Sequence, residues 1–170
     1  MTKDQFEQLI ERYHRSIQTL IYRIVWEWET ANDLAQDVFV KMWEKHNRIP
    51  LSDNIYTLLY RIAVHSAIDY LRRRKTTVQA DNLTASTNIW QKTEQANLFS
   101  IIEDCTRFLK PKQKAVFIMR DMEGFGIEEI ALIMNISAGS VRSNLHLARK
   151  NIREYLAKSF NITEESLYDL

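Results

Sequence analysis

The sequence contains little glycine or proline, 3 and 2 residues respectively among 170. Strands and hairpins depend on these residues for their turns, so an extensive β-sheet is excluded. Residues that favour helices are abundant instead, and they predict an all-α fold. The single cysteine, Cys105, excludes an intrachain disulfide and is compatible with a reducing cytoplasm.

Long apolar segments are also missing. No apolar run approaches the ~20 residues that a membrane-spanning helix needs. The N-terminus is charged and amphipathic and has no signal-peptide core, so we expect a cytoplasmic protein. The net charge is only +1, so any contact with nucleic acid must come from local basic clusters.

The residue patterns of common enzymes are absent as well. The four histidines are scattered, and none lies at metal-ligand spacing from another histidine or from Cys105. The chain has no glycine-rich phosphate loop. We therefore expect no enzyme activity, no metal and no cofactor.

Apolar residues at three- and four-residue spacing predict helices over 4–28, 31–46, 54–75, 94–109, 111–122, 126–134 and 138–157. Thr30 and Asp33 form a start signal for the second of these, Pro111 suits a first helical turn, and Gly124 is a plausible helix stop. Segment 76–93 is rich in Thr, Asn and Ser, which predicts a flexible linker, and the acidic tail 159–170 is expected to fray.

These elements predict two small helical domains, 1–75 and 94–158, joined by the linker 76–93. Each is small for an independent core. We expect their relative placement to be set by a partner rather than by a large interface between them.

The segment from about Gly126 to Lys150 has the features of a helix-turn-helix. Asn135 tolerates the left-handed backbone of a tight turn, and Ser137 can cap the helix that follows. The second helix of such a motif enters the major groove of DNA.

The exposed side of that second helix carries polar and basic residues, with no acidic residue before Glu154. Arginine can bind guanine bidentately and asparagine can bind adenine, whereas Arg149 and Lys150 are better placed for phosphates. The alternative is a solvated helix of an αα-hairpin, which the turn signature makes less favoured. The predicted DNA-contacting residues are Ser140, Arg142, Ser143, Asn144, His146, Arg149 and Lys150.

Three segments together resemble the extracytoplasmic-function (ECF) subfamily of bacterial RNA polymerase sigma factors. ANDLAQDVFVKMWEKH (31–46) resembles region 2.2, and IYTLLYRIAVHSAIDYLRRRK (55–75) resembles regions 2.3 and 2.4. LKPKQKAVFIMRDMEGFGIEEIALIMNISAGSVRSNLHLARKNI (109–152) resembles region 4. The lack of a large domain between these segments is the arrangement of the ECF subfamily.

The resemblance implies promoter recognition by a dissociable subunit of RNA polymerase. The first domain would dock on the clamp helices of the largest subunit of the core enzyme and open the −10 element. The second would read the −35 element and touch the flap of the neighbouring subunit. Many ECF relatives are held inactive by an anti-sigma factor, which is therefore a further possible partner.

The resemblance assigns the polar side of helix 31–46 to the clamp, through Asp33, Gln36, Asp37 and Glu44. From their spacing alone, a solvated acidic face would be the preferred interpretation. It assigns −10 recognition and melting to aromatic and basic residues that can stack bases and hold phosphates of separated strands. These residues are Asn54, Tyr56, Tyr60, Arg61, His65, Arg72, Arg73, Arg74 and Lys75.

Alternatives stay open for part of that set. Tyr56 and Tyr60 also have the spacing of core residues, and the basic run 72–75 also suits a solvated helix end. The chain departs from the family pattern at Leu58, where a tryptophan is usual, and at His65, where an asparagine is usual. In the second helix of the motif, Asn144 and Leu147 each replace an arginine, so the preferred −35 sequence cannot be copied from relatives.

A rival hypothesis is a helix-turn-helix regulator that binds DNA without core polymerase. Such a protein would share the last helices but would not need segment 31–46.

Overall fold

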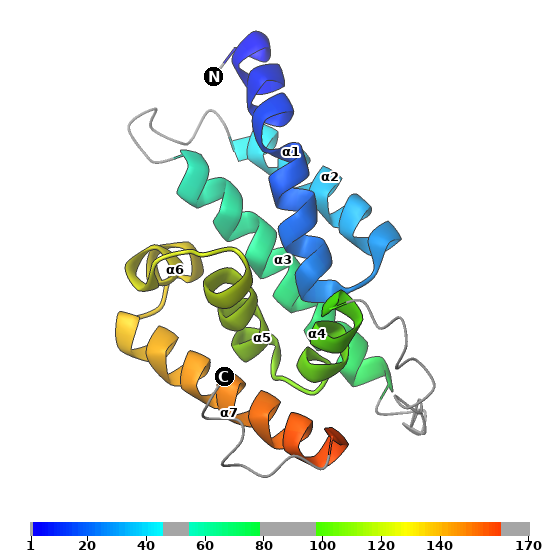
Figure 1. The fold of residues 1–170 in the computed structure, drawn as a ribbon. Helices are drawn as coiled ribbons and strands as arrows, with labels where there is room; N and C mark the ends of the chain where they lie inside the picture. The colour runs from blue at the N-terminus through cyan, green and yellow to red at the C-terminus, as the bar shows by residue number, and fades with distance from the viewer. Residues whose placement is uncertain (1, 46–54, 79–97, 161–170) are drawn as a thin grey trace.

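The computed structural model describes residues 2–45, 55–78 and 98–160, and every described element is helical. Helices α1 (Lys3–Val25), α2 (Trp28–Lys45) and α3 (Ile55–Val78) form one group. Helices α4 (Leu98–Thr106), α5 (Pro111–Phe117), α6 (Ile127–Met134) and α7 (Ala138–Phe160) form a second, with a π-helix, Ile118–Met122, directly after α5. Because every described element is a helix, the all-α prediction is confirmed. Figure 1 shows the two groups packed against each other.

Helix α1 begins in a capping box, in which Thr2 and Gln5 each bond the other's backbone amide. It ends at Val25 because Trp26 adopts a left-handed backbone with φ 57°, and its amide donates to the Tyr22 carbonyl at 2.6 Å. The predicted start signal for α2 at Thr30 was wrong. The left-handed turn lets α2 begin already at Trp28, so Thr30 lies inside the helix.

The core of the first group consists of large side chains from α1 packed on small and medium ones from α2 and α3. Ile17, Leu20, Ile21 and Ile24 are buried on α1. Small residues let the helices approach closely, and those buried here are Ala31 and Ala35 on α2 and Ala63 and Ala67 on α3.

The buried side chains of the second group, around α5, the π-helix, α6 and α7, continue the hydrophobic core of the first. Ile118, Met119, Ile130, Ile133 and Val141 are all fully buried there. Pro111 occupies the first turn of α5, and Gly124 has φ +79° just after the π-helix, as expected for a helix stop.

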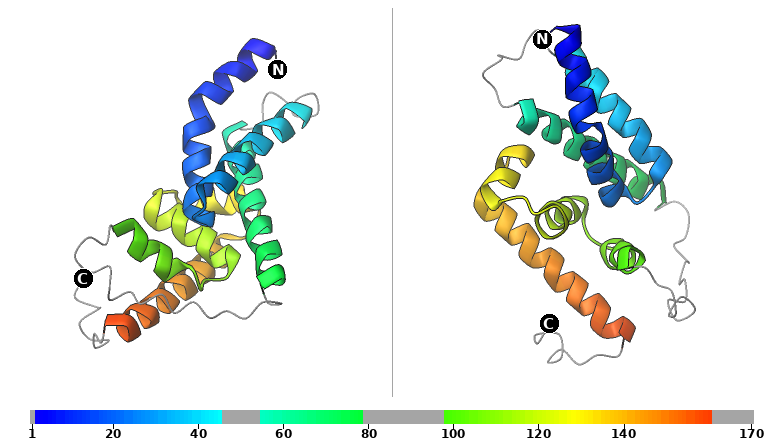
Figure 2. Two further views of the ribbon diagram at one scale, coloured as in Figure 1. Left: turned by 90° about the vertical axis from the view of Figure 1, so that its right-hand side faces the viewer. Right: turned by 45° about the horizontal axis from the view of Figure 1, so that its top comes forward.

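The expectation that no large interface joins the two groups is contradicted. Helix α3 packs on α5 and α6, and α1 packs on the π-helix, as the two further views in Figure 2 also show. The contact is polar as well as apolar. Arg23 and Glu123 form an ion pair at 2.6 Å, and the Trp26 indole N–H donates to the Thr106 hydroxyl at 3.1 Å.

Two predicted boundaries also differ. Helix α3 continues three residues beyond the predicted end at 75, to Val78, and α7 continues to Phe160. Residues 79–93 of the predicted linker, 94–97 of the predicted helix 94–109 and 161–170 of the predicted tail lie outside the described residues, and the described part of that helix, α4, ends at Thr106. No helix among the described residues is long and apolar enough to cross a membrane.

Candidate nucleic-acid interface

Helices α6 and α7 form the predicted helix-turn-helix. Asn135 has φ 52° and ψ 50°, and its amide donates to the Ala131 carbonyl. The Ser137 hydroxyl accepts the Ser140 amide at 3.1 Å, which caps the first turn of α7. Both turn residues therefore have the conformations that the sequence predicts, and they fix the angle at which α7 leaves α6.

The outward face of α7 holds the seven residues predicted to contact the −35 element. All are exposed except Asn144, which is half-buried. Arg142 is 64% exposed and lies 3.4 Å from the Glu128 carboxylate, a surface pair that competes little with a phosphate or base. Arg142, Ser143 and His146 are thus accessible although the two groups of helices are packed together, an arrangement that we call closed.

Several members of the α7 set have partners within the chain, among them Lys150, which lies 3.8 Å from the Glu154 carboxylate, and two are held more tightly. The Asn144 amide donates to the Ser140 carbonyl at 2.8 Å. Arg149 makes a bidentate ion pair with Asp121 of the π-helix, at 2.9 and 2.6 Å, and this bonding raises the pKa of Arg149. Sequence reasoning missed Asp121, because its position opposite α7 depends on the wider turn of the π-helix, which no motif announces.

Helix α2 presents the four residues predicted to contact the polymerase clamp. Asp33, Gln36, Asp37 and Glu44 are all exposed and share one face of the helix. Sequence reasoning did not include two apolar residues on the same face, Val40 and Trp43, which are 56% and 37% exposed. Acidic residues surrounding exposed apolar ones have the composition of a protein-binding surface.

The first half of α3 lies against the second group of helices rather than in solvent. Tyr56 and Tyr60 pack on each other and on Phe125, with Tyr60 and Phe125 ring centroids 5.3 Å apart. The Arg61 guanidinium donates to the Leu132 carbonyl at 2.7 Å. Burial, and then the Glu129 carboxylate, raise the pKa of the Tyr56 phenol. Packing between helices, the alternative that the sequence left open for Tyr56 and Tyr60, therefore describes where their rings lie.

The solvent side of α3 at His65 and its basic end are exposed. The His65 ring lies in solvent with its Nδ1 2.8 Å from the Arg61 carbonyl. Arg72, Arg73 and Arg74 are exposed, and Arg74 lies 3.5 Å from the Glu27 carboxylate. The pKa of Glu27 is lowered, chiefly because the Tyr70 hydroxyl donates to it. Of the remaining predicted −10 residues, Asn54 and the Lys75 side chain lie outside the described residues.

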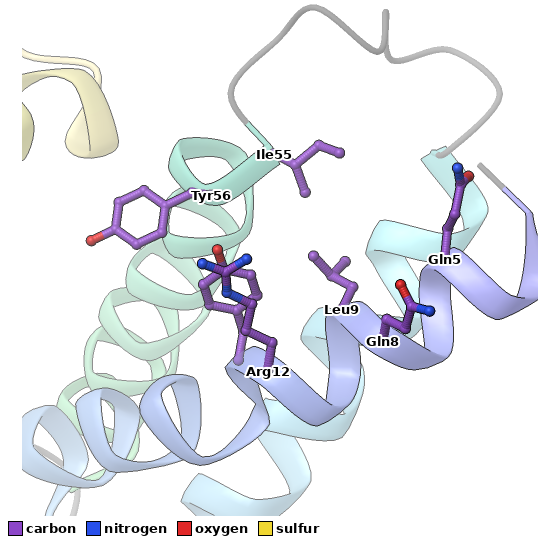
Figure 3. A pocket seen from close by; sticks show the side chains of 7 residues that line it. Gln5, Gln8, Leu9, Arg12, Ile55 and Tyr56 are labelled. Atoms are coloured by element: carbon purple, nitrogen blue, oxygen red, sulfur yellow. The ribbon is translucent and has the colours of Figure 1, made fainter.

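A pocket of about 350 Å³ separates the start of α1 from the start of α3. Figure 3 shows Gln5, Gln8, Leu9 and Arg12 of α1 on one side and Ile55 and Tyr56 of α3 on the other. The Arg12 guanidinium lies over the Tyr13 ring, 5.3 Å from its centroid. The pocket thus adjoins the aromatic part of the α3 surface.

The rest of the described chain offers little chemistry for catalysis. Cys105 is buried, and burial raises the pKa of its thiol to about 11, which keeps it protonated. Among the described residues, His, Cys, Asp and Glu form no group of three or more that could hold a metal ion.

Two family models match the two helical groups in chain order. Sigma-70 region 2 matches residues 9–77, and Sigma-70 region 4 matches residues 100–152. RNA polymerase sigma factor YlaC of Bacillus subtilis is 30% identical over 164 residues, which cover 92% of this chain and 95% of YlaC. The chain belongs to the ECF sigma factors of RNA polymerase.

Further relatives agree with this membership. ECF RNA polymerase sigma factor SigW of Bacillus subtilis is 25% identical over 91% of this chain and 90% of its own length. The sigma factor RpoE of Bartonella quintana, solved in complex with the anti-sigma factor NepR, shares the fold with a TM-score of 0.67 at 21% identity. The alignment covers 91% of this chain and 98% of RpoE.

The family settles the general function. The chain is a sigma factor that acts in transcription initiation, with α1–α3 as region 2 and α4–α7 as region 4. The rival hypothesis of a regulator that works without core polymerase is not favoured, because it leaves the region 2 match unexplained.

Proposed function

We propose that three surfaces of this sigma factor divide promoter recognition between them. The clamp face, defined as Asp33, Gln36, Asp37, Val40, Trp43 and Glu44 of α2, binds the clamp helices of core RNA polymerase. The strand face, defined as Tyr56, Tyr60, Arg61 and His65 with the basic end of α3, binds the opened −10 element. The recognition face of α7, with Arg142, Ser143 and His146 at its centre, reads the −35 element, while region 4 touches the flap.

The observation that carries the proposal is the composition of the clamp face. Its acidic and apolar members recur at three- and four-residue steps along α2, and all are exposed. A solvated helix face has no need of an exposed Val40 beside the exposed part of Trp43, whose ring also packs on Phe6, whereas an interface uses an apolar centre within a charged rim. The recognition face has the opposite sign of charge, as a DNA contact requires.

The clamp face is tested with Val40→Arg. Because Val40 is 56% exposed, the change leaves the fold intact, but it places a cation at the centre of an acidic surface that faces a basic partner. We expect at least tenfold weaker binding to core polymerase, a loss of about 1.4 kcal/mol. Glu11→Gln on α1 is exposed and changes the net charge by the same amount, so it serves as the control.

The activity itself is tested by adding the chain to core polymerase with a supercoiled promoter library. We expect transcripts from a defined set of promoters, and none with the Val40→Arg variant. Promoter-specific transcription that survives Val40→Arg unchanged would place the clamp contact elsewhere on the chain.

Two partners belong to the same proposal. The solved structural neighbours include the sigma factor RpoE bound to the anti-sigma factor NepR, and CnrH bound to the cytosolic domain of CnrY. An anti-sigma factor is therefore a candidate partner of this chain. The cytoplasm, where core polymerase is found, is its proposed location.

A further inference from the structure

Region 4 covers the strand face, and its contacts there resemble those that the strand face would make with single-stranded DNA. Proteins bind single strands with aromatic side chains that stack on bases and with cations that contact phosphate oxygens. On α3, Tyr56 and Tyr60 are the aromatic groups and Arg61 is the cation. Each of these side chains is occupied by a group of similar chemistry from segment 123–132 of the same chain.

The aromatic contact comes from Phe125, which follows the glycine turn after the π-helix. Its ring lies 6.4 Å from Tyr56 at an interplanar angle of 21°, a stacked geometry, and it is 8% exposed. The backbone holds it there, because the Phe125 amide donates to the Met119 carbonyl and Arg120 donates to the Phe125 carbonyl. Phe125 thus gives Tyr56 the kind of ring contact that an unstacked base would give.

The oxygen contacts come from the end of α6 and from two carboxylates. The last carbonyls of a helix carry partial negative charge and lack helical donors. Here the Ile136 amide bonds to Ala131, and Arg61 donates to the next carbonyl, Leu132, at 2.7 Å. The Glu129 carboxylate lies beside the Tyr56 hydroxyl and contributes to its raised pKa.

The same interface is held together at its edge by the Arg23–Glu123 ion pair. Inside it, the Arg61 Nε is buried without an acceptor among the described residues. The closed arrangement therefore satisfies this guanidinium only in part, although arginine can donate five hydrogen bonds. A strand that supplied a phosphate to Arg61 could complete its bonding.

We propose that segment 123–132 of region 4 is an intramolecular substitute for the −10 strand. It covers the strand face in the free sigma factor and leaves when the strand binds. This inference rests on the proposed function of Tyr56, Tyr60 and Arg61. The recognition face of α7 stays exposed in the closed arrangement, so the cover acts on one half of promoter recognition only.

The test compares the free full-length chain with the double variant Glu123→Gln, Glu129→Gln. Both changes keep the side-chain shape, and glutamine at 129 still accepts the Gly126 amide that starts α6. They weaken the cover without touching Tyr56, Tyr60 or Arg61. The readout is the affinity for a fluorescent single-stranded DNA of randomised sequence. If closure leaves a tenth of the chains open, the variant should bind about tenfold more tightly.

The control raises the net charge by the same amount at another place in region 4. Glu103→Gln, Asp104→Asn removes two carboxylates of α4 that pair with Arg107. Any gain in DNA affinity that this control shares is a charge effect alone. Equal affinities of the control and the test variant would overturn the proposal.

A second comparison separates failure of the inference from failure of the proposed function. Tyr60→Phe, Arg61→Gln is added to the open variant, and the gain in affinity should disappear. If Glu123→Gln, Glu129→Gln raises the affinity for single-stranded DNA and the gain survives the addition of Tyr60→Phe, Arg61→Gln, the strand binds elsewhere. That result would overturn both the cover and the strand face. A different result would overturn only the cover. In that result, Glu123→Gln, Glu129→Gln does not raise the affinity for single-stranded DNA, while holoenzyme made with Tyr60→Phe, Arg61→Gln fails to open promoters.

Discussion

The two helices that we propose to contact DNA, α3 and α7, differ in how accessible their predicted DNA-contacting residues are. On α7, Arg142, Ser143 and His146 are exposed, and the turn before the helix is set by Asn135 and Ser137. On α3, Tyr60 is buried and Arg61 is bonded to region 4. On the proposed function, region 4 therefore presents its recognition face preformed, whereas the strand face of region 2 needs a change in domain arrangement first.

The comparison extends to how each region is stabilised. Region 2 consists of three long helices around one set of isoleucines and leucines, with alanines where helices approach closely. Region 4 consists of short helical segments before one long helix, α7, with left-handed or positive-φ residues at its turns, and it buries a lysine. The predictions below test this difference, from the largest expected effect to the smallest.

The two cores are first compared by Ile133→Ala in region 4 and Ile24→Ala in region 2, both fully buried. Each change leaves a cavity and should cost roughly 2–5 kcal/mol of unfolding free energy in its own region. In a Trp90→Phe background, urea unfolding followed by tryptophan fluorescence reports on the three remaining tryptophans, Trp26, Trp28 and Trp43 of region 2, whereas far-UV circular dichroism reports on both regions.

We expect Ile133→Ala to shift the fluorescence transition less than the circular dichroism transition, since Ile133 lies within region 4, whereas the regions meet through the contacts of α3 with α5 and α6 and through the pairs Arg23–Glu123 and Trp26–Thr106. Coincident and equal shifts would mean that the two regions unfold as a single unit, and the distinction between their cores would be lost.

The second prediction compares two arginines of α7. Arg142→Ala removes an exposed guanidinium and should weaken binding to a duplex promoter fragment by about 1–3 kcal/mol. Arg149→Ala should change the salt dependence of binding less, because Asp121 already neutralises Arg149. Affinity is measured from 50 to 200 mM salt, where a lost phosphate contact lowers the slope by about 0.9. A larger slope change for Arg149→Ala would show that Asp121 releases it to the DNA.

The third prediction concerns the buried cation of region 4. Lys114 is 5% exposed, and burial lowers the pKa of its ammonium from 10.5 to about 8, against the opposing effect of Glu103. The folded chain therefore binds fewer protons than the unfolded chain between these values. The unfolding free energy should therefore rise as the pH increases from about 8 to 10.5. At pH values below about 8, the folded chain bears the full free-energy cost of burying the charged ammonium.

Lys114→Met should raise the unfolding free energy at pH 7 by about 1–3 kcal/mol and flatten the pH dependence above 8. Lys112→Met, at an exposed position two residues earlier, should do neither. Thermal melts of the three proteins from pH 6 to 10 make the comparison. A loss of stability in Lys114→Met would mean that contacts of the ammonium outweigh its desolvation.

Features that depend on residues close together in the sequence could be predicted, whereas contacts between distant residues could not. Helix periodicity and turn chemistry are local, and the turn of the helix-turn-helix was predicted to the residue at Asn135 and Ser137. The end of α1 was not, because tryptophan rarely adopts the left-handed backbone that Trp26 has. The signal at Thr30 then suggested a start for α2 that lies inside the helix.

The candidate site shows the same limit. The exposed positions of Arg142 and Asp37 follow from helix faces, which a sequence displays directly. The bonding of Arg61 to Leu132 and of Arg23 to Glu123 joins residues 71 and 100 positions apart, and neither pair belongs to a motif. Asp121 faces Arg149 only because a π-helix changes the direction of side chains after Phe117, and no local pattern marked that change.

The smallest expected effect concerns the turn that makes region 4 preformed. The Ser137 hydroxyl accepts the Ser140 amide, so Ser137→Ala should cost about 1 kcal/mol of region 4 stability. Ser137→Asp keeps an acceptor at the cap and should restore stability, while its charge lies close to the DNA. The two variants therefore separate folding from binding: alanine should lower the melting temperature with little change in duplex affinity below it, and aspartate should do the reverse. If alanine instead abolished duplex binding at temperatures where region 4 is folded, the cap would be needed to hold α7 in position, and the recognition face would be less preformed than its exposed side chains indicate.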